Sequence, residues 1–486
     1  MAENTQASLK GHIDKLVRHL EHENPELLAV VKTFRRLDKV SYKLGLLDQT
    51  ESYAEDVTWW PLISVLGTFS SGKSTFINDL LGAKLQTTGN QAVDDKFTVI
   101  CYGGKDKPRT LPGLALDSDP RFPFYKISRD IEEALEGEGS RLDTYLQLKT
   151  CPSQELRGKI VIDSPGFDAD DQRNATLRIT DHIINLSDLV LVFFDARHPE
   201  PGAMTDTLEY LVAAPLHRPD FNKFMYILNQ IDNAAREDNP EEVFAAWQRA
   251  LGQKGHTTGR FYRIYNRSAA VPIEDEGLRA RFEAKRDEDM AEIEKRISEL
   301  DVQRSYRVAG KLEQTAKEVR DELVPKLTAA RRAWRKRLLW LDGIVFGGGL
   351  LALLALSAAL GYWQGLSFEA PWLTYLSARP LLLWAAVIVV AAGLFQLHRE
   401  LRRLAGRSVL KKLRKASKPG ATSERLANAF EFNIHSWRPV LMDAPVGWGP
   451  LSARRLDAIL SDADRSIQEL NDRYADPSGN RSAQGG

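Results

Sequence analysis

Cysteine is scarce in this chain, which contains only Cys101 and Cys151 among its 486 residues. Two cysteines cannot supply the disulfide framework of a small secreted domain, and they suit a reducing compartment or none in particular. The sequence also lacks cysteine or histidine pairs at zinc-site spacing, a nucleophile triad, a calcium-binding loop and solenoid-type repeats. These absences exclude a disulfide scaffold, a zinc module and a repeat array as the basis of the fold.

An excess of charge of one sign is also missing. Lysine and arginine together number 66, as do aspartate and glutamate, so the formal net charge is zero. A balanced chain offers no overall basic field to a nucleic acid, and we predict no nucleic-acid partner. The first residues lack both an apolar signal core and an arginine-rich amphipathic pattern, so we expect no cleaved targeting segment.

Charged residues are absent from two long apolar runs. Residues 343–361 read GIVFGGGLLALLALSAALG, and residues 381–397 read LLLWAAVIVVAAGLFQL. As helices these runs would be about 28 and 26 Å long, close to the hydrocarbon thickness of a bilayer. They predict a transmembrane hairpin within 338–397, with spans at 343–361 and 381–397. The alternative is a pair of helices buried in a soluble core.

Basic residues flank the two runs. RRAWRKR precedes the first run, and 398–418 after the second holds nine lysines or arginines against Glu400 alone. By the positive-inside rule both flanks stay in the cytoplasm, which predicts a two-pass protein with both termini there. The flanks either bind anionic headgroups or only fix the topology. The Ala-, Leu- and Arg-rich composition favours a bacterial inner membrane.

The segment VLGTFSSGKSTFINDLLG, residues 65–82, matches the phosphate-loop pattern G-x-x-x-x-G-K-[ST]. A strand-like run precedes the pattern and a helix-like run follows it. Converging backbone N–H groups and the helix N-terminus attract phosphates, Lys73 supplies a positive charge, and the Ser74 hydroxyl can ligate Mg²⁺. The predicted nucleotide-binding residues of this segment are Gly67, Ser70, Ser71, Gly72, Lys73, Ser74 and Thr75.

A second motif, DSPG at residues 163–166, follows another strand-like run. Asp163 is placed to hold Mg²⁺, directly or through water, and the Gly166 N–H can reach a γ-phosphate. The alternative is an ordinary turn.

A third motif, NQID, predicts the base-reading site from Asn229, Gln230 and Asp232. An ionised Asp232 accepts two hydrogen bonds that guanine can donate and adenine cannot, so the motif favours GTP. An acidic cap for the following helix is the alternative. Further along, Ser268 or Ala269 is positioned to close over the base.

Strand-like and helix-like runs alternate from about 59 to 275. This alternation predicts an α/β domain with a mostly parallel sheet and helices on both faces. The expected strands are PLISVLG, FTVICYG, YLQLKT, GKIVIDS, LVLVFFDA, KFMYILNQ and FYRIYN.

The motifs GTFSSGKSTFIN, DSPGFDADDQR, LVLVFFDARHPE and LNQID resemble the GTPase domain of the dynamin superfamily. They are most similar to those of the EH-domain-containing ATPases and bacterial dynamin-like proteins. The resemblance implies that Ser70 positions the attacking water with a monovalent cation, and we predict Ser70 and Lys73 as the catalytic residues. EH-type members use ATP, so ATP is the alternative nucleotide.

The sequence departs from this family at two places. Gln230 stands where a lysine usually covers the purine, and Val93 and Asp94 stand where the first switch carries threonines. Asp94 is a predicted Mg²⁺ ligand, but its charge would repel a γ-phosphate. Alternatively, Thr87 or Thr88 takes the role of the missing switch threonine. Nucleotide binding is therefore better supported than hydrolysis.

Apolar residues at helical spacing flank the nucleotide domain. They predict N-terminal helices within 1–58, a helical stalk at 276–337 and C-terminal cytoplasmic helices at 398–475, followed by a disordered tail at 476–486. Pro325 is expected to kink or end a helix. Because the hairpin returns the chain to the same side, these helices can pack as one antiparallel bundle.

These features predict a membrane-anchored dynamin-like GTPase that binds and hydrolyses GTP with Mg²⁺. Its partners would be the lipid bilayer and further copies of itself, with dimerising heads that remodel, tether or fuse membranes. The alternative is a membrane-bound nucleotide switch with little hydrolysis that recruits a partner protein. The missing switch threonine favours the switch, and the long flanking helices favour the membrane-remodelling GTPase.

Overall fold

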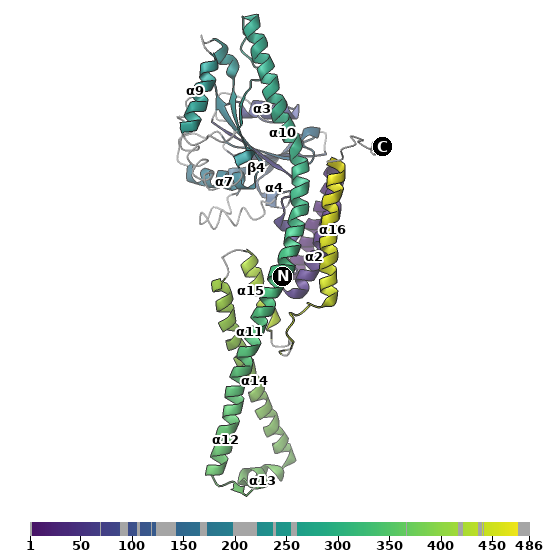
Figure 1. Ribbon diagram of the computed structural model, residues 1–486, viewed down its shortest axis with the longest axis vertical. Helices are drawn as coiled ribbons and strands as arrows, with labels where there is room; N and C mark the ends of the chain where they lie inside the picture. Colours follow the sequence, from purple (N-terminus) through teal and green to yellow (C-terminus); the bar gives the residue numbers. More distant parts are fainter. Residues whose placement is uncertain are drawn as a thin grey trace. The chain divides into compact units, whose positions relative to one another are not determined.

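The computed structural model describes residues 2–68, 70–87, 96–104, 107–117, 119–122, 142–165, 173–197, 221–236, 240–253, 260–365, 367–416, 421–435, 440 and 442–474. The chain forms two compact units. The head unit comprises residues 7–31, 54–309 and 467–486, and the stalk unit comprises residues 1–6, 32–53 and 310–466. Each unit is described by itself below (Figure 1).

An eight-stranded sheet forms the centre of the head unit, with the strand order β3-β4-β2-β5-β1-β6-β7-β8. Its strands are β1 (Leu62–Gly67), β2 (Phe97–Tyr102), β3 (Arg109–Pro112), β4 (Leu146–Cys151), β5 (Ile160–Asp163), β6 (Leu189–Asp195), β7 (Phe224–Asn229) and β8 (Arg260–Arg263). β1 pairs in parallel with β5 and β6, and parallel pairing continues through β7 to β8. β2 runs antiparallel to β5, and β3 antiparallel to β4. The predicted mostly parallel sheet is confirmed.

The edge strand β3 was not among the predicted strands. All four of its residues are exposed. A strand with no buried face has no need for alternating apolar and polar positions, which is the pattern that identifies a strand in a sequence. The run FYRIYN also forms a shorter strand than expected, since β8 ends at Arg263.

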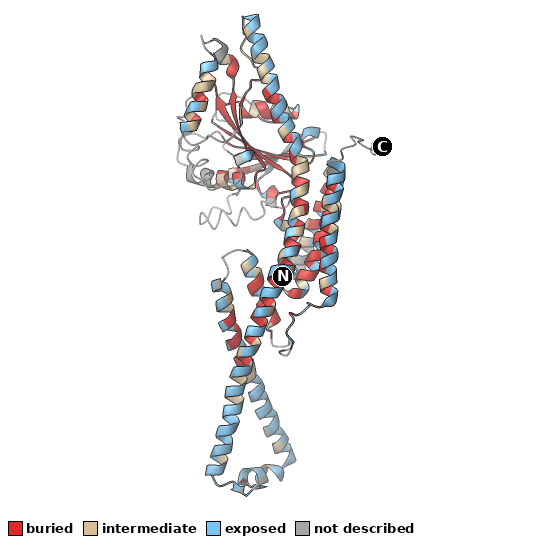
Figure 2. Cartoon of the chain, in the orientation of Figure 1, coloured by how far each residue is buried: buried red, intermediate tan, exposed pale blue. Residues whose placement is uncertain are grey.

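Helices cover both faces of the sheet, as predicted. The helices in or entering the head unit are α1 (Ala2–Glu23), α3 (Lys73–Leu81), α4 (Leu114–Asp117), α6 (Leu142–Tyr145), α7 (Arg173–Leu186), α9 (Pro240–Gln253) and the first part of α10 (Glu276–Lys317). Short 3-10 turns span Pro25–Leu27, Gln154–Leu156, Phe221–Lys223 and Ile231–Arg236. One face packs α3 and α10 against the sheet, and the other packs α7 and α9 (Figures 1 and 2).

Helices make up most of the stalk unit. They are α2 (Leu28–Leu44), the end of α10, α11 (Val324–Asp342), α12 (Gly348–Ala359), α13 (Pro371–Ser377), α14 (Pro380–Ala416), α15 (Ala421–Asn433) and α16 (Pro450–Tyr474). A 3-10 turn at Tyr53–Asp56 and a two-stranded ribbon of β9 (Trp363–Gln364) and β10 (Ser367–Phe368) complete the described elements. The predicted antiparallel helix packing is present within this unit.

Asn433 holds several segments of the stalk unit together. Its side chain is fully buried, donates Nδ2 to the Leu44 carbonyl at 3.1 Å, and accepts hydrogen bonds at Oδ1 from Arg331 Nη1 at 3.1 Å and Val446 N at 2.6 Å. A buried amide that uses both donor and acceptor ends fixes its neighbours, because leaving either end unpaired is costly.

Pro325 neither ends nor breaks the helix at its position. The backbone winds as a π-helix over Glu318–Leu323, and α11 then begins at Val324 with Pro325 in its first turn. Proline has no N–H to donate and clashes with the carbonyl four residues earlier, and the wider π turn accommodates both effects. A second π turn spans Gly343–Gly347, ahead of α12.

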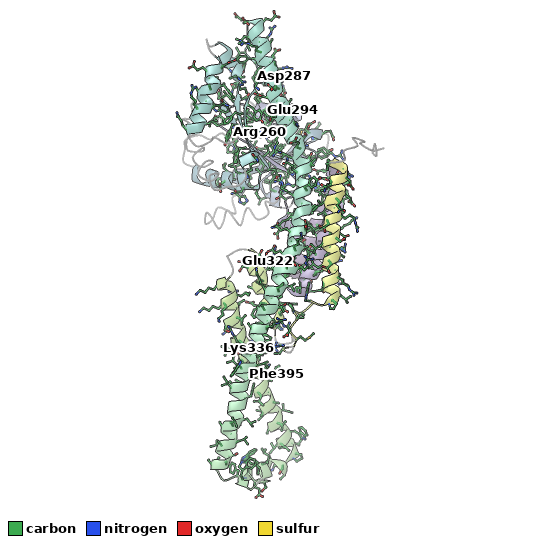
Figure 3. All side chains as sticks on the ribbon, viewed as in Figure 1. Arg260, Asp287, Glu294, Glu322, Lys336 and Phe395 are labelled. Carbon is green, nitrogen blue, oxygen red and sulfur yellow. The ribbon has the colours of Figure 1, made fainter. Side chains whose placement is uncertain are left out.

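The two apolar runs lie on exposed helices of the stalk unit. Two described helices, Glu276–Ala359 and Pro380–Lys415, are long and apolar enough to cross a membrane, and only 6% and 0% of their most apolar windows are buried. The alternative of a buried helical pair would require mostly buried windows. Figure 2 shows α12 and the first part of α14 almost entirely exposed, whereas the second part of α14 contains buried residues such as Leu401 and Val409. Phe395, labelled in Figure 3, is 59% exposed.

Candidate nucleotide-binding site

The loop between β1 and α3 has the backbone conformation that a phosphate-binding loop needs. Ser70 and Gly72 have positive φ angles of 60° and 86°, and α3 begins immediately afterwards at Lys73. A Cβ atom built on Gly72 would lie 2.2 Å from Asn229 Nδ2, and one on Gly67 would lie 2.7 Å from the Phe193 carbonyl oxygen. Both positions therefore require glycine, and the N-terminus of α3 faces the loop as an anion site.

Lys73 is held beneath this loop. Its Nζ donates to the carbonyl oxygens of Gly67 at 2.8 Å and Thr68 at 3.0 Å, and the residue is 7% exposed. Burial lowers the pKa of the Lys73 ammonium to about 8, against the opposing effect of the Asp163 charge. A phosphate bound at the loop would provide a negative counter-charge close to this ammonium.

Asp163 ends β5 beside the loop, as predicted. It is buried at 4% exposure, and its Oδ2 accepts a hydrogen bond from Gln86 Nε2 at 2.6 Å. Ser74 lies on the first turn of α3, partly exposed. One hydroxyl and one carboxylate suit Mg²⁺, which takes few protein ligands and completes its shell with water and phosphate oxygens. The structure has no cluster of three or more histidine, cysteine, aspartate or glutamate side chains able to hold a metal ion among the described residues.

The base-reading motif is bonded directly to the phosphate loop. Asn229 Nδ2 donates to the Ser71 carbonyl at 2.8 Å, and Gln230 Nε2 donates to the Ser70 carbonyl at 2.6 Å. Gln230 itself has a positive φ of 62°. These bonds bring together the first and third motifs, which are separated by about 160 positions in the sequence.

Asp232 follows in a short 3-10 turn, and its Oδ2 accepts a hydrogen bond from Val271 N at 2.7 Å. Burial raises the pKa of Asp232 above its usual value of 3.8, while the backbone hydrogen bonds and nearby Arg197 act in the opposite direction. Val271 belongs to the loop after β8, so this carboxylate connects the two loops expected to surround a base.

A small pocket lies next to these residues. Gly72, Thr75 and Asn229 line it together with Asn266 and Arg286. Asn266 and Arg286 were not predicted as site residues, because only Ser268 and Ala269 of the segment NRSAA were assigned to the base and Arg286 belongs to no recognised pattern. Their position beside Gly72 depends on β8 and α10 folding against α3. Ser268 lies outside this pocket lining, and its hydroxyl and backbone N both donate to Asn266 Oδ1.

Other predicted residues of the first and second switch lie outside the described residues. These are Thr88, Val93, Asp94 and Gly166, and their roles stay predictions. Thr87 is described and exposed.

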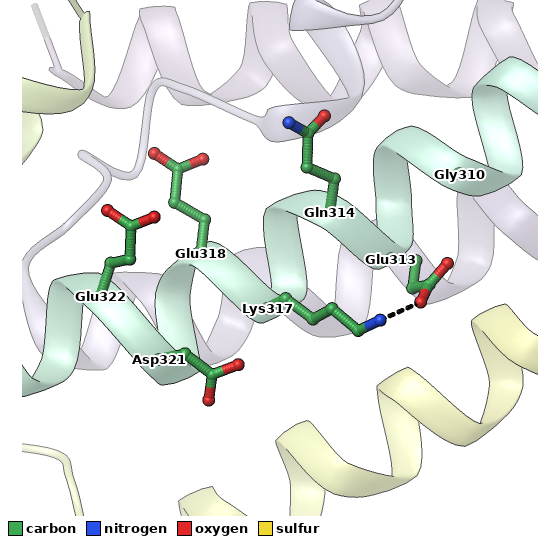
Figure 4. Close-up of a pocket in the computed structure, with 7 residues that line it drawn as sticks. All are labelled: Gly310, Glu313, Gln314, Lys317, Glu318, Asp321 and Glu322. Carbon is green, nitrogen blue, oxygen red and sulfur yellow. Dashed lines mark hydrogen bonds and ion pairs between the residues drawn. The ribbon is translucent and has the colours of Figure 1, made fainter.

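A second hollow, in the stalk unit, does not suit a nucleotide. Its lining includes the acids Glu313, Glu318, Asp321 and Glu322 and the single cation Lys317, which is paired with Glu313 (Figure 4). An excess of carboxylates repels a triphosphate. Among the described residues, the loop of the head unit is therefore the better candidate for a nucleotide site.

Residues 63–231, which contain the first two motifs and the third as far as Ile231, match the dynamin family. Residues 63–231 form a dynamin-family domain. Proteins of this superfamily are nucleoside triphosphate hydrolases. The head unit thus carries the fold that the motifs predicted.

Two curated relatives match the same part of the chain. EH domain-containing protein 2 of Homo sapiens is 26% identical over 234 residues, which cover 46% of this chain and 39% of that protein. EH domain-containing protein 1 of Homo sapiens is 24% identical over 212 residues, covering 42% and 36%. The chain therefore spans less than two-fifths of the length of these relatives.

A solved structure aligns over most of the chain. It is described as an oligomerised bacterial dynamin pair for the long range sensing and tethering of membranes, and it covers 96% of this chain and 76% of its own. The sequence identity is 14% and the TM-score is 0.32.

Proposed function

We propose that this protein is a membrane-anchored dynamin-like GTPase that binds and hydrolyses GTP with Mg²⁺. The observation that supports this most strongly is the bonding of the base-reading motif to the phosphate loop, through Asn229 and Ser71, in a chain that also carries two exposed apolar helices. A nucleotide site and a bilayer anchor in one chain are the minimum for a mechanical membrane GTPase.

In the proposed site, residues from different loops have separate roles. Lys73 neutralises phosphate charge, and Ser74 and Asp163 would hold Mg²⁺, which supplies further positive charge to the phosphates. Asp232 would select GTP, with ATP as the alternative. Ser70, held in a left-handed conformation and bonded through its carbonyl to Gln230, would position the attacking water.

The proposed anchor is a two-pass hairpin within 338–397. Leu353 is 65% exposed and Val389 is 70% exposed, which in water would leave much apolar surface uncovered. His398 Nδ1 lies 3.1 Å from Asp342 Oδ2 and joins the two helices at one end of the apolar runs. The basic flanks favour a topology with both termini in the cytoplasm, and the composition favours a bacterial inner membrane.

We further propose that the heads dimerise when nucleotide is bound and that the helices beside the hairpin carry this change to the bilayer. The outcome would be remodelling, tethering or fusion of membranes, with the bilayer and further copies of this chain as partners. The alternative function is a nucleotide switch that hardly hydrolyses and recruits a partner protein. Val93 and Asp94, in place of the switch threonines, are the observation that favours it.

The deciding experiment uses the full-length protein reconstituted into liposomes. Hydrolysis of GTP and ATP is measured separately as a function of protein density in the membrane. Turnover that increases with density supports the mechanical GTPase, whereas tight binding without turnover supports the switch.

The matched variant is Lys73→Ala, which removes the buried ammonium and should abolish nucleotide binding. Wild-type affinity in this variant would show that the loop is not the nucleotide site.

A further inference from the structure

Gln86 connects two buried charged side chains on different strands of the head unit. Its Nε2 donates to Asp163 Oδ2 at 2.6 Å, and its Oε1 accepts a hydrogen bond from Lys149 Nζ at 2.6 Å. Gln86 and Asp163 are each 4% exposed, and Lys149 is 8% exposed. A neutral amide therefore lies between an anion on β5 and a cation on β4.

The backbone of Gln86 is fixed independently of its side chain. Asn78 on α3 accepts hydrogen bonds at Oδ1 from the N–H groups of Leu85 and Gln86, each at 2.8 Å, and donates Nδ2 to the Gln86 carbonyl at 2.8 Å. The helix α3 also begins with the phosphate-loop lysine, so the same helix fixes the backbone of Gln86 and forms the candidate nucleotide site.

We propose that Gln86 is a positioning residue for the divalent ion, which fixes the Asp163 carboxylate and keeps the Lys149 ammonium one side chain away from it. The inference rests on the proposed function, in which Asp163 holds Mg²⁺. Gln86 does not touch the nucleotide in this role; it acts through Asp163.

An amide and an ammonium could each donate a hydrogen bond to Asp163, and they differ in charge. An amide N–H orients a carboxylate without offsetting its negative charge, so the carboxylate still attracts a divalent cation. A buried ammonium bonded directly to Asp163 would offset that charge and compete with the ion. Lys73 already interacts electrostatically with Asp163. A second lysine in contact would weaken the site further.

Glutamine is well suited to this position. Its single side chain donates to the anion and accepts from the cation, so both buried charges are satisfied at once. A leucine would satisfy neither charge, and an asparagine is one methylene too short to span the same gap.

The test measures the affinity of the full-length protein in detergent for a fluorescent GTP analogue across a Mg²⁺ titration. Gln86→Leu should raise the Mg²⁺ concentration at half-maximal effect by about tenfold or more, as loss of partners of metal ligands commonly does. Affinity measured in EDTA should stay within about twofold of wild type, because the phosphate loop is unchanged.

Gln147→Leu is the matched control. Gln147 also donates its Nε2 to a partner in the same sheet, and that partner is Thr98 Oγ1, at 2.7 Å, rather than Asp163. Its Mg²⁺ response should equal that of wild type. An unchanged Mg²⁺ response in Gln86→Leu, or an equal shift in both variants, overturns the proposal.

Two further variants keep the test decisive. If Gln86→Leu does not fold, Gln86→Asn takes its place in the test. It retains the amide on a shorter side chain and should also raise the Mg²⁺ requirement. Lys149→Met added to Gln86→Leu should recover part of the lost Mg²⁺ affinity, because the competing ammonium is gone. No recovery overturns the spacing role. If wild type binds no GTP analogue with or without Mg²⁺, the proposed function fails instead, which is a separate result.

Discussion

Arg304 on α10 donates a hydrogen bond to the carboxylate of Asp188, although 116 residues separate them in the sequence. The same carboxylate accepts a hydrogen bond from the backbone N of Leu62 at 2.9 Å, and Arg307 pairs with it at 2.5 Å. Leu62 is the first residue of β1, the strand that leads into the phosphate loop. Within the head unit, Asp188 therefore connects α10 to β1, the strand that leads into the candidate nucleotide site.

Replacing Asp188 with Asn should destabilise the head unit by about 3 kcal/mol or more, because it leaves a buried guanidinium without a counter-charge. The Asp188 side chain is 1% exposed, and burial lowers the pKa of Arg304. Chemical denaturation measures the loss. Asp287→Asn is the control: its pair with Arg267 is exposed, so the change should be below about 1 kcal/mol. Equal losses in both variants would contradict the buried-pair account.

Gly72→Ala should abolish nucleotide binding. The new methyl group would meet Asn229 Nδ2 at 2.2 Å and occupy a backbone with φ of 86°, so the bond from Asn229 to the loop would break. Gly82→Ala is the matched control, since Gly82 also has a positive φ of 59° but has no atom within 4 Å of the added carbon. The control should cost only about 1 kcal/mol of stability and retain GTP affinity by calorimetry. Retained affinity in Gly72→Ala would refute the loop geometry.

Nucleotide affinity should be constant between neutral pH and about pH 8 and fall as the pH rises above 8. The pKa of Lys73 is lowered to about 8 by burial, and bound phosphate raises it again by favouring the ammonium. Above pH 8 binding therefore requires uptake of a proton, which lowers affinity by at most about tenfold per pH unit. Calorimetry in buffers of different ionisation enthalpy detects that proton. No uptake at pH 9 would show that Lys73 does not contact the phosphates.

Discrimination between GTP and ATP should weaken in acid. Only the ionised Asp232 carboxylate accepts both hydrogen bonds from guanine, and burial raises the pKa of Asp232, so protonation begins at a higher pH than for an exposed aspartate. GTP affinity should fall toward that of ATP as the pH decreases through this range. At neutral pH, Asp232→Asn should reduce GTP affinity by about tenfold or more and leave ATP affinity unchanged. A variant that loses both nucleotides equally would contradict a base-reading role.

Leu353→Arg should impair stable membrane insertion. Leu353 lies within the first apolar run at 65% exposure, and an arginine at the centre of a span costs about 3 kcal/mol on insertion scales. Leu404→Arg is the control, because Leu404 is similarly exposed at 54% but lies in the basic segment of α14 beyond the second run. The fraction that resists carbonate extraction from membranes is measured. Full resistance of Leu353→Arg would argue against a span at 343–361.

Part of the candidate site was predictable because it is encoded locally. Gly67, Gly72 and Lys73 lie on one strand–loop–helix segment, so their spacing alone determines how they face a phosphate. Asp163 follows the same logic at the end of β5. Gln86, Asn266 and Arg286 have no such spacing, and only the packing of α3 against β5, β8 and α10 gives them a place at the site. Val93, Asp94 and Gly166 lie outside the described residues and stay predictions.

By itself, the sequence determined the phosphate loop, the α/β alternation and the two charge-free runs, because hydrophobic period, glycine position and charge are properties of short segments. The tertiary structure alone decided the exposed edge strand β3, the π turn that absorbs Pro325, and the pairing of Asp188 with Arg304. Each of these depends on residues far apart in the chain or on a backbone geometry that no local pattern specifies. The pairing of buried charges and the register of a helix are determined only when the elements pack against one another.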